Sequence, residues 1–429
     1  MALKKNSAFL RLSALAASAL LIAGVATGCT SGSTSSATAT STTATATTTS
    51  ANATTNASTA GTTALSTYDT HYDADDLVWD SSEEYTVTLS DSGSTSDSSA
   101  VSVDGSTVTI SAAGVYRISG TLSDGQIVVT AADTDSVVLI LDGVNISSST
   151  GPAISVVSAD EAIIYTESDT QNSLADGSGY TVANDATPVA TIASASDLTF
   201  AGEGTLIVTG NTNDAISASD GLVIVSGTIN ATGADDGIRG KDYIVVYDGQ
   251  ISVEAAGDAI KSDNTTDTER GWILIGGGSL TVNAGDDGIN AEQALEIAAG
   301  TVTIESAVEG IESTALTISG GDVSITTSDD GINASSYLET TTGGTEADDG
   351  STLVISGGTV DINAGADGLD SNGSIELSGG TITIASGQAG EGNIADANGG
   401  ITLDGATVTA NGQQITSADQ LSAGTRGQR

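Results

Sequence analysis

The chain has 429 residues and a formal net charge of −45, because 55 Asp and Glu residues outweigh 10 Lys and Arg residues. This charge excludes nucleic acids and anionic membrane surfaces as partners, since both are negatively charged. Glycine is abundant (53 residues), proline is scarce (2), and aromatic residues make up only 3% of the chain. With many Ser, Thr, Val and Ile residues, this composition favours short β-strands joined by turns over long helices.

Residues 1–29 predict an export signal. A basic start at Lys4, Lys5 and Arg11 precedes the apolar run "LSALAASALLIAGVA", which ends shortly before Cys29. The run is too short and too rich in small residues for a transmembrane helix. A signal that ends at a lone cysteine resembles a bacterial lipoprotein signal, which implies a lipid anchor at Cys29 on the outer face of the cell membrane. The alternative is an ordinary signal peptide followed by an incidental cysteine.

Residues 30–70 are mostly Thr, Ser and Ala, and they predict a flexible spacer that cannot bury a core. The only histidine of the chain, His71, follows directly. A single histidine excludes metal sites built from several histidines and makes serine–histidine catalysis implausible.

A repeat runs through the rest of the chain. A glycine opens each segment of the form G-(T/S)-(V/L)-x-(I/V), and these glycines lie 21 to 23 residues apart except across two insertions. They are Gly204, Gly227, Gly249, Gly278, Gly300, Gly321, Gly358 and Gly380. Each unit holds three short pieces in which apolar and polar residues alternate, with a D-G-I corner between two of them. The repeat is hard to place over residues 155–203.

Three short strands in every ~22 residues predict an all-β fold, a single-stranded parallel β-helix whose coils stack at about 4.8 Å and share one core. Leucine-rich repeats have a similar length, but their Asn and their helical half are missing here. In the unit opened by Gly300, five aliphatic residues are expected to point inward. We expect one monomeric domain over residues 75–412 and a C-terminal tail at residues 413–429.

A carboxylate recurs nine residues after the repeat glycine in six consecutive units: Asp236, Asp258, Asp287, Glu309, Asp330 and Asp367. Asp235 and Asp286 precede two of these residues. In stacked coils such acids form a column whose neighbouring charges repel. Turn geometry explains an Asp at a corner, but Asn turns equally well. The second interpretation is that the column binds Ca²⁺, which prefers oxygen ligands. Asp263, in a neighbouring insertion, joins these candidate ligands.

Four cationic residues gather on two neighbouring units: Arg239, Lys241, Lys261 and Arg270. Arg239 and Lys261 both lie twelve residues after their repeat glycines, so we expect them to be vertical neighbours beside the column. They either compensate its charge or pair with the carboxylate of an acidic sugar that calcium bridges to the protein.

Two aromatic residues point to the same region. Tyr243 and Trp272 occupy one outward-facing position on successive units. An exposed pair of rings suits the flat faces of sugars, which makes these two residues candidates for carbohydrate binding together with the four cationic ones. The alternative is that both rings pack against a loop.

Four segments carry a resemblance to a known family: "LILDGVNISSSTGPAI" at 139–154, "NSLADGSGY" at 172–180, "ADDGIRGKDYIVV" at 234–246 and "GDDGINAEQALEI" at 285–297. They resemble the secreted clostridial carbohydrate-binding parallel β-helix family, once catalogued as a domain of unknown function. The resemblance implies a right-handed β-helix related to polysaccharide lyases, bound Ca²⁺, and binding of cellulose and of acidic polysaccharides such as polygalacturonate. The acidic corners of the family match Asp235, Asp236, Asp258, Asp286 and Asp287.

The leading hypothesis is a cell-surface protein that binds polysaccharide through a calcium-loaded acidic face. A calcium-dependent polysaccharide lyase is the first alternative, with Lys241, Lys261 or Arg239 as the only plausible bases. Crowded carboxylates favour the charged forms of these bases, which counts against it. The second alternative is a surface adhesin or stalk that binds a protein.

Overall fold

The structure is a computed structural model that describes residues 68–336, 347–387 and 392–422. The predicted signal, Cys29 and nearly all of the predicted spacer lie outside these residues. Within the described ranges, no helix combines the length and the apolar character needed to cross a membrane.

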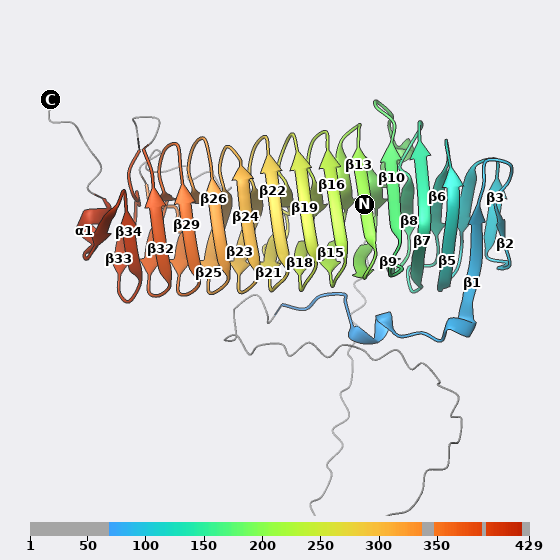
Figure 1. Cartoon of the computed structure of the whole chain (residues 1–429), viewed down its shortest axis with the longest axis horizontal. Helices are drawn as coiled ribbons and strands as arrows, with labels where there is room; N and C mark the ends of the chain where they lie inside the picture. The colour runs from blue at the N-terminus through green and yellow to red at the C-terminus, as the bar shows by residue number, and fades with distance from the viewer. Residues whose placement is uncertain (1–67, 337–346, 388–391, 423–429) are drawn as a thin grey trace, which may run out of the picture. The chain divides into compact units, whose positions relative to one another are not determined.

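The described strands wind into a parallel β-helix, as predicted, and its coils stack in chain order (Figure 1). A regular coil contributes one strand to each of three faces. The first face consists of β10 (Gln171–Asp176), β13 (Thr205–Gly210), β16 (Thr228–Gly233), β19 (Gln250–Ala255), β22 (Ser279–Ala284), β24 (Thr301–Ser306), β26 (Asp322–Thr326), β29 (Thr359–Asn363), β32 (Thr381–Ala385) and β34 (Thr407–Ala410).

The second face follows the D-G-I corner, and several of its strands have only three residues. It consists of β4 (Thr107–Ile110), β6 (Gln126–Thr130), β8 (Ile154–Ser158), β11 (Ala190–Ser194), β14 (Asp214–Ala218), β17 (Ile238–Gly240), β20 (Ile260–Ser262), the starts of β23 (Ile289–Ile297) and β25 (Ile311–Ile318), β27 (Ile332–Ala334) and β30 (Leu369–Ser371).

The third face completes each coil. It consists of β9 (Glu161–Thr166), β12 (Asp197–Gly202), β15 (Gly221–Ile224), β18 (Tyr243–Val246), β21 (Trp272–Ile275), the ends of β23 and β25, β28 (Thr352–Ile355), β31 (Ser374–Leu377) and β33 (Gly400–Leu403). Two long strands, β5 (Gly114–Leu122) and β7 (Ser136–Ser148), turn from the third face into the first.

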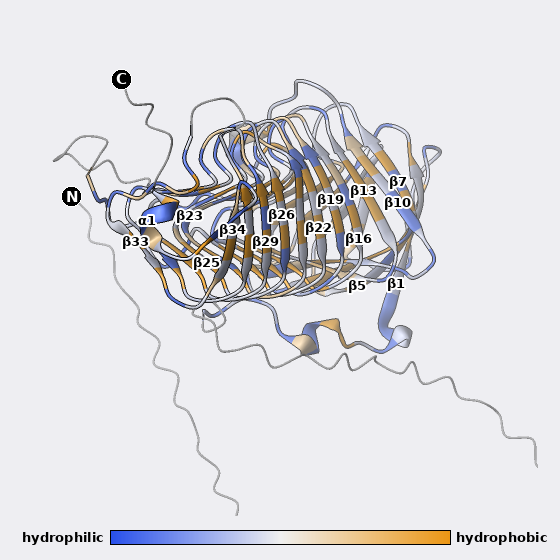
Figure 2. Cartoon of the chain, turned by 60° about the vertical axis from the view of Figure 1, so that its left-hand side comes forward, coloured by the Kyte–Doolittle hydropathy of each residue, from blue (hydrophilic) through white to orange (hydrophobic). Residues whose placement is uncertain are grey.

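The core is a set of aliphatic columns inside the coils. Ile238, Ile260, Ile289, Ile311 and Ile332 follow one another in register on the second face, and each is 0% exposed. Fully burying one such side chain contributes about 1.5–3 kcal/mol. The five residues predicted to point inward in the Gly300 unit are all buried. Figure 2 shows the resulting alternation of apolar and polar residues along the strands.

Glycine is needed at two corners of the coil for different reasons. Gly278 and Gly300 have φ angles of 75° and 88°, a conformation that favours glycine. A Cβ on Gly288, in the D-G-I corner, would instead lie 2.6 Å from the carbonyl oxygen of Gly310. The D-G-I glycine therefore permits the close approach of the next coil.

The two ends of the solenoid are closed by antiparallel pairs. β1 (Glu84–Leu89) pairs with β2 (Thr95–Ser96), β3 (Val101–Asp104) pairs with β4, and β35 (Gln413–Ile415) pairs with β34. α1 (Ala418–Leu421) follows β35, and Leu421 is 0% exposed. Residues 413–422 therefore cap the open end of the core, which corrects their assignment to a tail. Capping units depart from a repeat because one side of them meets solvent.

The coils also continue through residues 155–203, where the repeat was hard to read. β8, β9, β10, β11 and β12 keep the order of the faces. The irregularity is confined to an excursion between β10 and β11, which holds the 3-10 helix η4 (Ala183–Asp185).

Candidate metal and carbohydrate site

The acids predicted to share one position do stack, at the turn from the first face into the second. Strand register places each of them two residues before an aliphatic residue of the second face. The carboxylate column consists of Asp214, Asp236, Asp258, Asp287, Glu309, Asp330 and Asp367. Asp214 was not predicted, because nine residues after Gly204 comes Asn213. Counting back from Ile216, in the phrase "DAI", would have found it.

Hydrogen bonds tie the column together from coil to coil. The backbone N–H of Asp258 donates to Oδ1 of Asp236 at 3.0 Å, and the N–H of Asp287 donates to Oδ1 of Asp258 at 2.9 Å. The same bond recurs nearer both ends of the column. The corner carboxylates thus accept hydrogen bonds from the backbone of the next coil. An ionised carboxylate accepts such a bond more strongly than the amide of Asn does.

Burial makes the column costly to ionise. Burial, followed by the charge of Asp236, raises the pKa of Asp214 to about 7 from an ordinary value of 3.8. Burial likewise raises the pKa of Glu309 to about 7 and that of Asp330 to about 6. Such a column favours bound protons or bound cations.

Asp214, Asp235 and Asp236 form a compact group near the N-terminal end of the column. One oxygen from each carboxylate lies within 4.8 Å of the others. Asp214 and Asp236 are buried and Asp235 is exposed, so the group is open to solvent on one side. Ca²⁺ binds several oxygens in flexible geometry, and this set of donors fits it.

The other predicted ligands take different places. Asp287 and Glu309 join Glu312, on β25, in a second group whose oxygens also lie within 4.8 Å of one another. Asp286 is exposed and belongs to neither group. The last two members of the column likewise stand outside both groups among the described residues.

The cationic residues compensate the acids, which was one of their two predicted roles. Nζ of Lys261 lies 2.7 Å from Oδ2 of Asp258 and 3.4 Å from Oδ2 of Asp236. Burial lowers the pKa of Lys261, but its hydrogen bond to Asp258 and the nearby charges outweigh burial and raise that pKa overall. Arg239 lies beside Lys261 in register and binds Asp263 through two nitrogens at 2.7 to 3.0 Å. Asp263, a predicted metal ligand, is thus held by Arg239.

Lys241 and Arg270 have fewer partners. Lys241 is half-buried at the turn after β17, and it takes part in none of the ion pairs between described residues. The guanidinium of Arg270 lies 5.5 Å from the centroid of the Tyr243 ring and 3.7 Å from Asp242. Lys241 is therefore the cation of this region that is best placed to meet an anionic ligand.

Tyr243 and Trp272 do not form an open platform. Their rings stack at 4.8 Å on the outer side of the third face, but each residue is only 2% exposed. Residues 68–80, the N-terminal strap, cover them, and part of this strap was assigned to the spacer. Tyr68 stacks on Trp272 at 5.2 Å, and Nδ1 of His71 lies 2.7 Å from Oη of Tyr243. Of the two predicted environments, packing against another segment is the correct one.

His71 anchors the strap to the coils. Its Nε2 lies 2.9 Å from Oγ1 of Thr199 and 3.6 Å from Oε1 of Glu161. Its Nδ1 lies 3.1 Å from Oδ1 of Asp197. Burial raises the pKa of Glu161 to about 7. The single histidine of the chain thus serves a structural contact.

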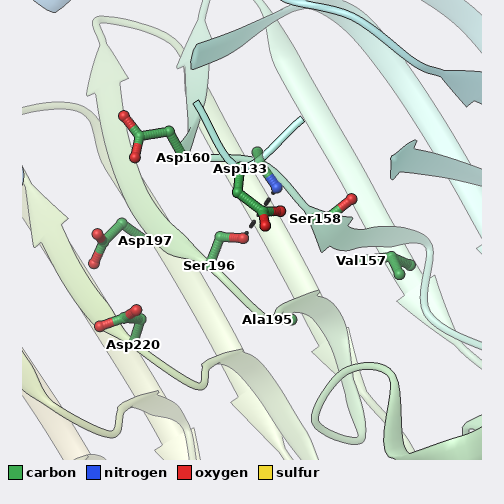
Figure 3. A pocket seen from close by; sticks show the side chains of 9 residues that line it. Asp133, Val157, Ser158, Asp160, Ala195, Ser196, Asp197 and Asp220 are labelled. Atoms are coloured by element: carbon green, nitrogen blue, oxygen red, sulfur yellow. Dashed lines mark hydrogen bonds between the residues drawn. The ribbon is translucent and has the colours of Figure 1, made fainter. Parts of the chain in front are cut away.

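An acidic hollow of about 310 Å³ opens at the turn from the second face into the third. Its carboxylates come from successive coils: Asp133, Asp160, Asp197 and Asp220 (Figure 3). The backbone N–H of Ala159 donates to Oγ of Ser196 at its wall, at 3.2 Å. Among the described residues, these acids form no group with three oxygens within 4.8 Å. The hollow is therefore less suited to a cation than the column is.

Comparisons with known proteins agree with the resemblance. Residues 104–352 match a family model described as carbohydrate-binding domain-containing protein. A carbohydrate-binding domain-containing protein of Acetivibrio thermocellus is 36% identical over 199 residues, which are 46% of this chain and 70% of that protein. Among solved structures, the match to a gadolinium derivative of a polysaccharide lyase-like protein from C. thermocellum covers 56% of this chain and 93% of that chain, with 29% identity and a TM-score of 0.48.

Proposed function

The chain belongs to the carbohydrate-binding domain family, and from this premise we propose that it binds an acidic polysaccharide through a Ca²⁺ ion held by Asp214, Asp235 and Asp236. The observation that carries the proposal is the convergence of these three carboxylates, two buried and one exposed. Cationic side chains of the neighbouring coils lie beside them.

The chemistry of the group supports a bridging ion. Ca²⁺ takes about six to eight oxygen ligands, so three carboxylates leave positions for water and for ligand oxygens. A uronate carboxylate supplies such oxygens, and the ion offsets its repulsion from an acidic protein. Lys241, at the other end of β17 and without an ion pair among the described residues, offers a positive charge to a further carboxylate of the same polymer.

The preferred ligand in this proposal is a uronate polymer such as polygalacturonate. Cellulose is neutral and is bound mainly on aromatic surfaces, and the aromatic pair Tyr243–Trp272 is covered by the strap. The charged group at the column is open to solvent through Asp235.

Calorimetry with polygalacturonate tests the proposal. Binding should require Ca²⁺ and disappear in excess chelator. Asp235→Asn/Asp236→Asn should weaken binding roughly tenfold or more, because the charge of the ligand set controls calcium affinity. Asp329→Asn is the matched control: Asp329 precedes Asp330 as Asp235 precedes Asp236, but it belongs to neither cation group. Binding at full strength in chelator removes calcium from the proposal, and full binding by the double variant removes this site.

A calcium-dependent lyase is a second candidate, because Lys241 is half-buried and takes part in no ion pair among the described residues. The other two predicted bases are poorly suited, since both already form ion pairs, Lys261 with Asp258 and Arg239 with Asp263. Incubation with polygalacturonate and Ca²⁺ at neutral to alkaline pH is the test. New absorbance from unsaturated uronate that is lost in Lys241→Ala supports the lyase, and no absorbance retires it.

We further propose that the protein is exported and lipid-anchored at Cys29, on the outer face of the bacterial membrane. The signal-like segment and the spacer that follows support this location. Radiolabelled palmitate should enter the protein and not Cys29→Ala; equal labelling of both contradicts the anchor. The adhesin alternative predicts specific capture of a protein partner without any polysaccharide binding.

A further inference from the structure

The N-terminal strap covers an outward-facing column of the third face that begins with two acids. In register, this column consists of Glu161, Asp197, Gly221, Tyr243 and Trp272. A Cβ on Gly221 would lie 2.2 Å from Cζ of Tyr243, so the ring lies over the glycine of the previous coil, on the side of the acids. The strap therefore encloses two carboxylates as well as the aromatic pair.

His71 lies between the two acids, and each nitrogen of its ring faces an acceptor. Nδ1 lies 3.1 Å from Oδ1 of Asp197. Oγ1 of Thr199 donates to Oε1 of Glu161 at 2.7 Å, so it accepts a hydrogen bond from Nε2 of His71 at 2.9 Å. A neutral ring could accept from Oη of Tyr243 at Nδ1, 2.7 Å away, but its lone pair would then also face the oxygen of Asp197. The protonated ring, which donates from both nitrogens, fits the site better.

The surroundings of His71 are mostly acidic. Besides Tyr243, the titratable and charged groups around it are Tyr72, Asp73 and Asp76 of the strap, Glu161, Asp197 and Asp220 of the coils, and Arg270. Burial raises the pKa of Glu161 to about 7 from an ordinary value of 4.5, although the hydrogen bond from Thr199 and the charge of His71 oppose this shift. The site therefore gains buried negative charge when it loses its protons.

The sign of the resulting pH dependence follows from Glu161. With the strap in place, this carboxyl is only 6% exposed and binds its proton more tightly than a carboxyl in water. The closed strap is therefore favoured below about pH 4.5 and loses this advantage as the pH rises through about 7. Deprotonation of His71 acts in the same direction, because it removes the charge that pairs with Asp197.

Much of the strap has little buried surface of its own. Val78 is 69% exposed, Tyr68 is 42% exposed, and no residue of η2 (Ala74–Leu77) is buried. Trp272 beneath the strap is 2% exposed, yet its indole N–H has no acceptor among the described residues. Opening the strap would let water pair with this N–H, and a buried polar group without a partner is costly. The contacts of His71 are therefore a large part of what holds the strap closed.

The C-terminal end of the strap is attached in a different way. Trp79 packs edge-on against the ring of Tyr165 at 5.2 Å, and its Nε1 donates to Oε1 of Glu84 at 3.1 Å. These contacts involve neither His71 nor the two acids around it. Loss of the contacts of His71 therefore frees residues 68–78 and leaves the chain attached at Trp79.

We propose that the N-terminal strap is a pH-sensitive latch pinned by His71. Protons bound by His71 and Glu161 hold residues 68–78 against the third face, and loss of these protons releases them. Release exposes the stacked rings of Tyr243 and Trp272, so the pH decides whether this aromatic surface meets solvent. The latch does not depend on the proposed calcium site, which lies at a different corner of the coils.

Quenching of tryptophan fluorescence by acrylamide tests the latch, because the chain has only two tryptophans, Trp79 and Trp272. Trp79→Phe leaves Trp272 as the only reporter. Its quenching is measured at constant Ca²⁺ from about pH 5 to about pH 9, around the range in which histidine titrates. We expect Trp272 to be protected at the acidic end. The open fraction should rise by up to about tenfold per pH unit for each proton released.

Two further substitutions should shift this profile in opposite directions. His71→Gln removes the charge that pairs with Asp197, so Trp272 should be quenched even at about pH 5. Glu161→Gln keeps its position neutral at every pH, so protection should extend to higher pH. Asp69→Asn, which removes an exposed charge elsewhere in the strap, is the control and should leave the profile unchanged.

Three results overturn the latch. One is equal quenching of Trp272 at about pH 6 and about pH 8. Another is an unchanged profile in His71→Gln. The third is a rise in quenching that coincides with loss of the β-sheet signal in circular dichroism, because the coils then unfold as a whole. Should His71→Gln not fold, Glu161→Gln decides alone, and an unchanged profile in that variant overturns the proposal.

Discussion

The carboxylate column and the aromatic pair are built by the same repeat, yet they end in opposite states. At the column, like charges are packed together, and part of their charge has no partner among the described residues. On the outer side of the third face, the rings of Tyr243 and Trp272 are already covered by Tyr68 and His71. The aromatic pair, which resembled a sugar-binding surface, is covered by other residues of the chain. The carboxylate column, which turn geometry could explain in part, keeps charge that no partner among the described residues neutralises.

The comparison shows that the repeat of a solenoid and the segments outside the repeat have different roles. Repetition places identical positions above one another and so creates columns of like residues. A segment outside the repeat then decides which column stays accessible, because it can cover one face and leave another open. Here the N-terminal strap covers the aromatic pair, and the function is expected at the corner that it leaves open.

The largest expected effect concerns the column and is a dependence of stability on pH. Burial raises the pKa of Asp214 and of Glu309 to about 7, from ordinary values of 3.8 and 4.5. The folded state thus binds more protons than the unfolded state, so stability is highest near pH 4 and falls as pH rises to about 7. Summed over the column, we expect a loss on the order of several kcal/mol in chelator. Unfolding in denaturant at several pH values measures it.

Calcium is the control for this prediction. Ca²⁺ binds the ionised carboxylates and should restore most of the stability lost at neutral pH. A calcium-free protein that is equally stable at pH 5 and pH 7 would show that burial does not raise the pKa values of these acids. The column would then differ little from an ordinary acidic surface.

The aromatic pair offers the next largest effect. Trp272 is 2% exposed and lies between Tyr243 and Tyr68, so Trp272→Ala should lower the free energy of unfolding by about 3–5 kcal/mol. Trp272→Phe keeps a stacked ring and removes an indole N–H that has no acceptor among the described residues, so it should cost less than about 1.5 kcal/mol. Calcium-dependent binding of polygalacturonate should survive in Trp272→Phe. Its loss there would move the binding site to the aromatic face.

Removing the charge of Lys261 should have a smaller effect on stability, and it tests how much the carboxylate column depends on its counter-charge. Lys261→Met keeps much of the apolar stem but leaves Asp236 and Asp258 without their counter-charge. Because the lysine side chain is 27% exposed, we expect a loss of about 2–3 kcal/mol, less than for a fully buried pair. Arg239→Met leaves Asp263 without its partner, and because the Asp263 side chain is 23% exposed against 5% for Asp258, this variant should cost about 1 kcal/mol or less. Equal losses in both variants, measured in chelator, would contradict a special role for Lys261.

Much of the fold could be predicted because it depends on local alternation. The period of the aliphatic residues predicted three strands per coil, and the strand register follows it from Ile238 to Ile332. The closing elements could not be predicted in this way. A cap meets solvent on one side, so residues 413–422 do not carry the repeat.

The candidate site was predicted in part. Equal spacing predicted the stacking of the acids and the position of Lys261 beside them, but it left open whether Lys261 pairs with the acids, as it does with Asp236 and Asp258. Asp214 was missed because the preceding coil has one residue more between its glycine and its corner. The cover on Trp272 was left as one of two alternatives because alternation shows which side chains leave the coil, and it cannot show what packs on them.

The smallest effect tests whether the cover is a separate element. Tyr68 is 42% exposed and contacts Trp272 through one stacked ring, so Tyr68→Ala should cost about 0.5–1.5 kcal/mol. The loss should appear as faster hydrogen exchange in the strap, while the aliphatic columns stay protected, because segments with few buried contacts open locally. Tyr85→Ala, at another exposed tyrosine, is the control and should leave exchange in the strap unchanged. Faster exchange throughout the coils would show that the strap is part of the core. A gain of cellulose binding in Tyr68→Ala would instead identify the aromatic pair as a sugar surface that the strap blocks.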